Sequence, residues 1–159
     1  IYEGTNGIQA LDLVGRKLAT DGGKHMREYL NLIQSFINEE HAEDFKTDFI
    51  APLKKSVEHL QTALIFFMEN GLKNPLSAVS GATDFLHLVG LVSLGFIWSK
   101  KAKSAREQLE NSETKKEFLE AKILTGSYFM HRQLPETRLR LDKVLTGEKK
   151  VMSLATDQF

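Results

Sequence analysis

The sequence contains no cysteine and only three prolines among its 159 residues. Without cysteine, the chain cannot form disulfides, attack with a thiolate or bind a metal through sulfur, and this composition fits a reducing compartment. The chain also lacks an excess of either charge, since 21 basic residues balance 21 acidic ones. We therefore expect neither nucleic acid nor an anionic membrane surface as a partner.

Long apolar runs are absent as well. The most apolar stretch, residues 85–98, has 14 residues and contains two glycines, whereas a membrane-spanning helix needs about 20 apolar residues. The first residues include Glu3 and lack the basic and apolar regions of a signal peptide. Because 42% of the residues are hydrophobic and 26% charged, we expect one soluble, cytoplasmic domain with an ordinary core.

The sequence is rich in apolar residues at helical spacing, three or four positions apart, and no segment alternates as a strand would. Glycine pairs and single glycines end several of these segments, and two prolines stand at first helical positions. We predict an all-α fold, an antiparallel bundle of about four long helices with shorter terminal helices. The apolar stripes span residues 8–18, 26–37, 49–67, 75–111, 118–129 and 139–145.

Local signals predict how two of these helices begin and which way one of them faces. Thr47 or Asp48 is expected to cap the third helix, with Pro52 in its first turn. A capping box at residues 114–117 is expected to open the fifth helix. The residues predicted to face inward from the fifth helix are Phe118, Leu119, Ile123, Leu124 and Phe129.

The middle of the fourth segment, FLHLVGLVSLGFIW, is apolar nearly all round, which predicts burial on several sides. Gly81, Gly90 and Gly95 are expected to permit a close helix crossing or a kink. His87 lies within this stretch and is expected to be a hydrogen-bonded core histidine rather than a metal ligand.

The motifs of metal and phosphate sites are missing. A carboxylate-bridged di-iron bundle needs Glu-x-x-His pairs, and the sequence has none. His41, in the acidic stretch 39–44, is expected to lie in a solvated turn. The basic clusters at 100–106 and 132–143 are expected to be solvated helix surface. We predict no metal site.

The opening segment, IYEGTNGIQALDLVGRKL, places the carboxylate of Glu3 beside Gly4 and Gly7 at the start of a helical pattern. Thr5 or Asn6 can cap this helix, whose N-terminal N–H groups and dipole favour an anion such as a pyrophosphate. The residues alone predict an anion site beside a carboxylate. The alternative for Glu3 is an ordinary exposed acid.

This segment resembles the part of flavin-dependent acyl-CoA dehydrogenases that carries their catalytic base, with the pattern Tyr-Glu-Gly-Thr, then Ile-Gln and an amphipathic helix. Many relatives have Gln where Gly7 stands, so only a backbone contact can remain there. The later segments TDGGKHMREYL and FLHLVGLVSLGFIWSKKAK are similar to the additional C-terminal helical domain of a longer bacterial branch, which includes enzymes similar to 3-methylthiopropanoyl-CoA dehydrogenase. The matching residues of the opening are Tyr2, Glu3, Gly4, Thr5, Ile8 and Gln9.

The resemblance implies a role for each residue of the opening. Glu3 would be the base that removes the α-proton of an acyl-CoA thioester while a hydride leaves the β-carbon for FAD. Gly4 would lie against the acyl-CoA, and Thr5, Asn6 and Gly7 would face FAD. The whole enzyme would be an oxidoreductase that passes electrons to a separate acceptor and forms a homo-oligomer.

The resemblance also implies a division of the chain. Residues 1–23 would end the helical domain of the dehydrogenase, and residues 24–159 would form an appended helix bundle. Because the domains that hold FAD and substrate precede the base in such enzymes, the chain is expected to be a C-terminal portion that is inactive by itself. The alternative is a non-enzymatic helical interaction or oligomerisation module.

Overall fold

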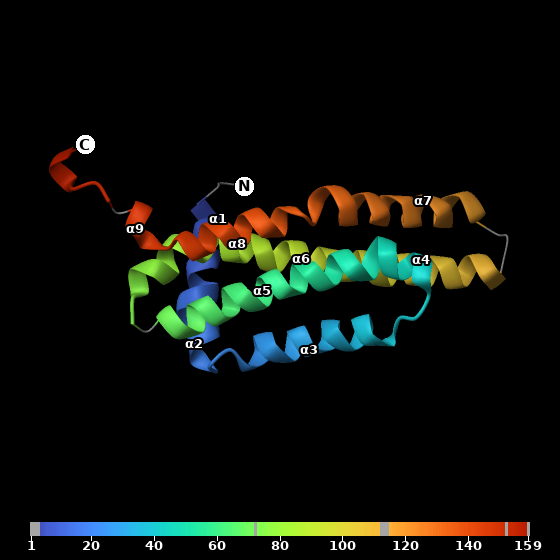
Figure 1. Cartoon of the computed structure of the whole chain (residues 1–159), viewed down its shortest axis with the longest axis horizontal. Coiled ribbons are helices and arrows are strands. Elements are labelled where there is room, and N and C mark those ends of the chain that lie inside the picture. The colour runs from blue at the N-terminus through green and yellow to red at the C-terminus, as the bar shows by residue number, and fades with distance from the viewer. Residues whose placement is uncertain (1–3, 72, 112–114, 152, 159) are drawn as a thin grey trace.

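The computed structural model describes residues 4–71, 73–111, 115–151 and 153–158, and all regular structure within these ranges is helical. Four helical rods lie side by side and run in alternating directions (Figure 1). The predicted all-α antiparallel bundle is therefore confirmed. The rods are α3 (Lys24–Glu39); α4 (Glu43–Phe45), η2 (Lys46–Ile50) and α5 (Ala51–Asn70); α6 (Pro75–Asn111); and α7 (Lys116–Tyr128), η3 (Phe129–Gln133) and α8 (Glu136–Thr146).

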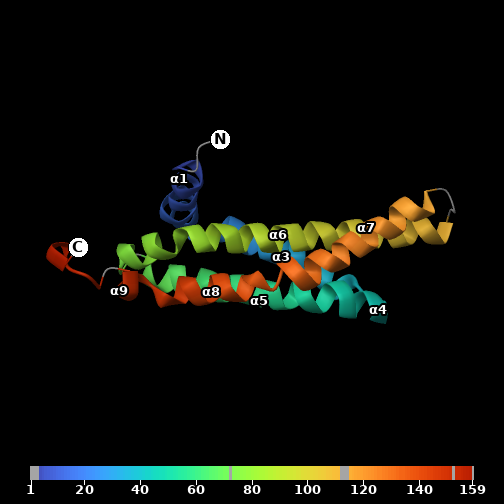
Figure 2. The ribbon, with the colours of Figure 1, turned by 90° about the horizontal axis from the view of Figure 1, so that it is seen from above.

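A shorter rod precedes the bundle and stands across it near one end, as the view from above shows (Figure 2). It consists of α1 (Gly4–Asp12), η1 (Leu13–Lys17) and α2 (Leu18–Thr20) and packs against α6. Two short helices follow the bundle, α9 (Glu148–Val151) and η4 (Thr156–Gln158).

Each of η1, η2 and η3 is a five-residue π turn inside a rod. In η3 the N–H of Leu134 donates to the carbonyl of Phe129 at 2.9 Å, the i to i+5 bond that defines such a turn. Because η2 continues the rod back to Glu43, Thr47 and Asp48 lie within a helix, and their prediction as caps is wrong.

The start of α7 also differs from the prediction. Lys115 occupies the cap position with φ 67° and makes no side-chain capping bond. Since the helix starts at Lys116, residues 114–117 are out of register for the predicted capping box, and Thr114 itself lies outside the described residues. Pro52, in contrast, lies in the first turn of α5 as predicted.

The core lies between α6 and the rods around it. Phe85, Leu88 and Val92 of α6 are fully buried, and the stripe of α3 is buried at Leu30 and Ile33. The apolar stripe predicted for the third helix is buried throughout. Its members are Phe49, Leu53, Val57, Leu60, Leu64 and Phe67.

The prediction that the middle of α6 is buried on several sides is wrong. Leu94 and Ile97 are 51% and 44% exposed, and His87 is exposed rather than a core histidine. The reason is that α5, α7 and α8 cover parts of α6 and leave one face of the helix uncovered.

Within the described residues, α6 is also the one helix long and apolar enough to cross a membrane, over Pro75–Glu110. Only 39% of its most apolar window is buried. The 14-residue run seen in the sequence falls short of the required length, but the whole helix meets it. Core helices of soluble proteins meet it as well, and α6 packs against three other helices along its length.

The fifth predicted stripe is partly wrong. Leu119 is buried as expected, but Phe118 and Leu124 are 57% and 73% exposed, while Gly126 and Met130 are buried instead. Because α7 lies at the edge of the bundle against α6 and η2, it buries only a narrow stripe. Ile123 and Phe129 are partly buried beside that stripe.

The glycines of α6 permit close crossings at two of the three predicted positions. A Cβ built on Gly81 would lie 3.4 Å from the Cα of Val144, and one on Gly95 would lie 3.0 Å from Leu134. These glycines bring α8 and the turn before it close to α6. Gly90 faces open space, so the prediction fails there.

We expect Gly95→Leu to lower the free energy of unfolding by about 1–3 kcal/mol, because the new side chain must displace Leu134 in a filled interface. The matched control is Gly90→Leu, which places the same side chain in open space on the same helix. It should be neutral or stabilise by less than about 1 kcal/mol, since glycine disfavours a helix. Urea unfolding compares the two variants, and equal losses would contradict the close crossing.

Candidate functional site

The residues predicted to form a site lie at the start of α1. Glu3, the predicted base, lies outside the described residues. Gly4, Thr5, Asn6 and Gly7 form the first turn of α1, where the first three are exposed and Gly7 is half-buried. Because the helix already includes Gly4, Thr5 and Asn6 lie inside it, and their predicted role as caps is wrong.

The first turn of α1 is open, whereas the rest of its rod is anchored. A Cβ built on Gly4 or Gly7 would meet nothing within 4 Å. Further along the same rod, Ala10, Val14 and Leu18 are buried in the core of the molecule. The helix therefore holds its first turn away from the bundle, as Figure 2 shows.

This arrangement has a definite chemical capacity. The first backbone N–H groups of a helix have no partner within the helix, and the dipole adds a partial positive charge there. An anion is favoured at such a position. The described residues offer no side walls around the turn, so a complete site needs groups from elsewhere.

An apolar groove lies further along the same rod, where η1 and α2 meet the end of α5 and the start of α6. Its volume is about 300 Å³, and its walls are almost entirely apolar. Leu11, Val14, Phe67, Met68 and Ala78 are among the lining residues. The groove shows that the short rod is not packed tightly along its whole length.

The turn between α2 and α3 joins the site-bearing rod to the bundle. Gly22 and Gly23 have φ angles of 60° and 75°, a left-handed conformation that favours glycine. The N–H of Gly23 donates to a carbonyl of the preceding helix, that of Leu18, at 3.0 Å. The helix stop predicted at this glycine pair is thus confirmed.

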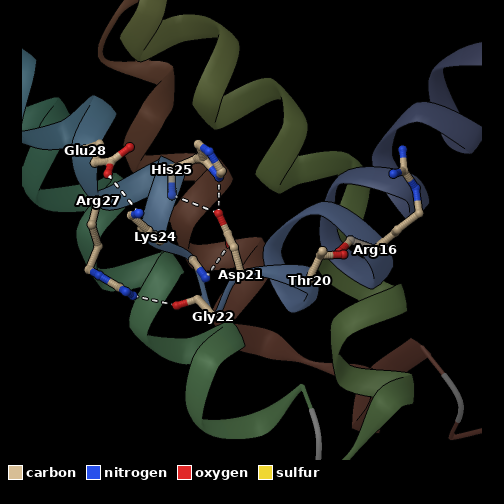
Figure 3. A network of polar contacts seen from close by, with 9 residues as sticks. Arg16, Thr20, Asp21, Gly22, Lys24, His25, Arg27 and Glu28 are labelled. Carbon is tan, nitrogen blue, oxygen red and sulfur yellow. Dashed lines mark hydrogen bonds and ion pairs between the residues drawn. The ribbon is translucent and has the colours of Figure 1, made fainter.

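Asp21 organises this turn (Figure 3). Its carboxylate accepts hydrogen bonds from the N–H groups of Gly23 at 2.9 Å and His25 at 3.0 Å, and it contacts the ring Nδ1 of His25. Arg27 closes the turn by donating to the carbonyl of Gly22 at 2.6 Å. The bond from the His25 N–H is the largest cause that lowers the pKa of Asp21, to about 2.

Sequence patterns missed one polar residue of interest, His59 of α5. It is 8% exposed, and its Nδ1 lies 3.0 Å from the hydroxyl of Thr137, which is 1% exposed. A signal for it was present, because position 59 adjoins the buried stripe of the third predicted helix. Within the described ranges, no group of three or more metal-ligating side chains is placed to hold a metal ion.

Comparison with known proteins gives a consistent answer. The family profile described as Acetyl-CoA dehydrogenase C-terminal like matches residues 29–155. The chain is 32% identical to a 3-methylmercaptopropionyl-CoA dehydrogenase of Ruegeria pomeroyi over 137 residues, which cover 86% of this chain and 23% of that protein. It is 26% identical to a broad-specificity linear acyl-CoA dehydrogenase of Mycobacterium tuberculosis over 162 residues, which cover 97% of this chain and 26% of that protein.

Fold and site together define a helical bundle domain with a short, site-bearing helix at one end. The matched profile covers most of the bundle, and the chain spans about a quarter of the length of the curated relatives it matches. The chain belongs to the acyl-CoA dehydrogenase C-terminal-like family.

We expect Asp21→Asn to lower the melting temperature at neutral pH, because the amide accepts the bonds from Gly23 and His25 less strongly. The pKa of Asp21 is lowered from 3.8 to about 2 in the fold. Its stabilising effect is therefore complete above the unfolded value and disappears as the pH falls through about 2.

Thermal unfolding of the wild type and Asp21→Asn between neutral and strongly acidic pH checks this. Asp12→Asn is the matched control, since the carboxylate of Asp12 pairs with the side chains of Arg16 and Lys17 on the helix surface and should contribute little. A difference between wild type and Asp21→Asn that persists unchanged in acid would contradict the proposed cause.

Proposed function

We propose that this chain is the C-terminal portion of an FAD-dependent acyl-CoA dehydrogenase, which removes the α- and β-hydrogens of an acyl-CoA thioester. The supporting observation is a conjunction. The Tyr-Glu-Gly-Thr motif at residues 2–5 directly precedes a bundle whose relatives are named acyl-CoA dehydrogenases. Neither feature alone supports the proposal as well as the two together.

In this proposal Glu3 is the general base. Its carboxylate takes the proton from the α-carbon, whose acidity rises when the thioester carbonyl is polarised. A carboxylate at this position becomes a stronger base once bound substrate excludes water, because desolvation disfavours the charged form. Gly4 has no side chain and thus lets the acyl-CoA approach the backbone closely.

The residues after Gly4 fit a contact with FAD in their chemistry. Thr5 offers a hydroxyl, Asn6 an amide and Gly7 a backbone approach with nothing within 4 Å of a built Cβ. They lie on the first turn of α1, where N–H groups and the dipole favour an anionic group such as a phosphate. FAD, when bound, accepts the hydride that leaves the β-carbon.

We also propose that residues 1–23 complete the catalytic helical domain and that residues 24–159 form an appended domain. The start of the matched family profile at residue 29 supports a boundary near this point. The proposed whole enzyme acts in the cytoplasm, passes its electrons to an electron-transfer acceptor and forms a homo-oligomer. The uncovered face of α6, with Leu94 and Ile97 exposed, suits packing against further protein.

The isolated 159-residue chain should be inactive, because its predicted site lies on an open helix turn without walls for FAD or substrate. After incubation with FAD and gel filtration, no flavin absorbance should elute with the protein. Acyl-CoAs of several chain lengths should likewise reduce no dye. Retained flavin together with turnover would contradict this part of the proposal.

In the full-length enzyme, Glu3→Gln should lower kcat by about 10²–10⁴-fold, the range of a lost general base. Stopped-flow flavin reduction measures the chemical step directly. Glu28→Gln is the matched control, since Glu28 is exposed and forms only a 3.8 Å ion pair with Lys24. Normal flavin reduction in the Glu3 variant would refute its role as the base.

A further inference from the structure

A second cavity lies far from α1, between α5 and the junction of η3 with α8. Its volume is about 470 Å³, within the range of small-molecule sites. Two π turns contribute to its walls, with Thr47 from η2 and Met130 and His131 from η3. Such turns occur frequently at functional sites. The predicted dehydrogenase site uses none of these residues.

His59 is the buried polar group of this cavity, and its hydrogen bonds assign its tautomer. The hydroxyl of Thr137 has one proton, which it donates to the carbonyl of Leu134 at 2.8 Å. The Nδ1 of His59, 3.0 Å from that hydroxyl, must therefore be the donor. In a neutral ring, Nε2 then carries a lone pair, and His59 lines the cavity.

The ring is neutral near pH 7 for a physical reason. Burial, followed by the positive charges of Arg138 and Lys55, lowers the pKa of His59, against weaker effects of Glu58 and Asp142 in the opposite direction. The neutral ring can accept a hydrogen bond at Nε2 without first losing a proton.

The hydroxyl groups around the cavity are acceptors too. Thr47 donates its proton to the carbonyl of Glu43 at 3.2 Å, and Ser56 donates to the carbonyl of Leu53 at 2.7 Å. With their protons used in this way, the hydroxyl oxygens can offer only lone pairs. The polar part of the wall thus calls for a ligand that donates an N–H or O–H.

The same cavity presents positive charge. Lys55 lies one turn before His59 on α5, and Arg138 follows Thr137 on α8. Arg138 is already paired with Asp142 at 3.0 Å, whereas Lys55 makes no ion pair within the described residues. Its ammonium group is therefore available to an anion. Met130, Leu134 and two prolines supply apolar walls between the polar groups.

We propose that this cavity binds a small organic anion that also carries a hydrogen-bond donor, of the hydroxycarboxylate kind. The anionic group pairs with Lys55, the donor reaches Nε2 of His59, and the short carbon chain lies on Met130 and Leu134. This assignment is independent of the proposed dehydrogenase function, because it rests on residues of α5, η3 and α8 alone.

Three probes of similar size separate the parts of this recognition. 3-Hydroxybutyrate has both the charge and the hydroxyl, butyrate lacks the hydroxyl, and 1,3-butanediol lacks the charge. NMR titration of the 159-residue chain should show the Nε2 signal of His59 unprotonated at the start and shifted on binding. 3-Hydroxybutyrate should bind about three- to tenfold more tightly than either of the other probes, the value of one net hydrogen bond.

Variants then assign each contact. Lys55→Gln should weaken 3-hydroxybutyrate and butyrate about three- to tenfold and leave butanediol unchanged, whereas Lys54→Gln, an exposed neighbour outside the cavity wall, should change none of them. His59→Phe should abolish the preference for 3-hydroxybutyrate over butyrate. Because His59 is buried, Lys55→Gln keeps the test informative if His59→Phe does not fold.

Several results would overturn the proposal. Equal binding of 3-hydroxybutyrate and butyrate would remove the donor contact with His59. Equal effects of the Lys54 and Lys55 variants would reduce the charge contact to a general surface effect. A protonated Nε2 in the free chain, or no shift of the His59 signals with any probe at millimolar concentration, would remove the site itself.

Discussion

The structure depends on how closely its other rods can approach α6. Small buried residues recur along this helix, among them Ala82, Gly95, Ser99 and Ala102. Helix axes can come nearer where such residues meet, since the distance between packed helices follows the size of the side chains at the contact. At Gly95 the methyl groups of Leu134 fill the space that a side chain would take. The position of α8, and with it the cavity beside His59, follows from this contact.

The two ends of the chain are treated differently by this packing. The rod that begins with α1 is anchored by Ala10, Val14 and Leu18 while its first turn stays open. At the other end of the chain, Glu148 accepts hydrogen bonds from the side chains of Asn74 and Ser77, so α9 is held against the start of α6. The bundle therefore closes on itself at one terminus and presents a helix start at the other. A domain appended to a larger enzyme needs this asymmetry, since the incoming chain must remain accessible to its own catalytic parts.

Sequence patterns predicted the elements well and the burial of edge residues poorly. The stripe of α5 was correct because that helix is covered on its whole apolar side, whereas Phe118 and Leu124 lie on an edge helix where hydrophobicity alone does not decide exposure. His87 was expected in the core because its neighbours are apolar, yet the histidine of the core is His59, whose partner Thr137 is 78 positions away in the sequence. Such a pairing depends on tertiary contacts that periodicity does not encode. The motif around Glu3 was found by resemblance, and its geometry lies outside the described residues.

The three π turns have a consequence for how this chain tolerates changes of length. A π turn holds about one residue more than the α-helical turn it replaces, so loss of a single codon within η3 would allow a continuous α-helix from α7 into α8. Everything downstream would then rotate by about 100°, the angle between neighbouring residues on a helix. Leu141 and Val144, now buried against α6, would swing off the interface, while surface positions would take their place. Gains and losses of one residue at these turns are thus changes of phase in the helix, and homologous chains should be aligned with that in view.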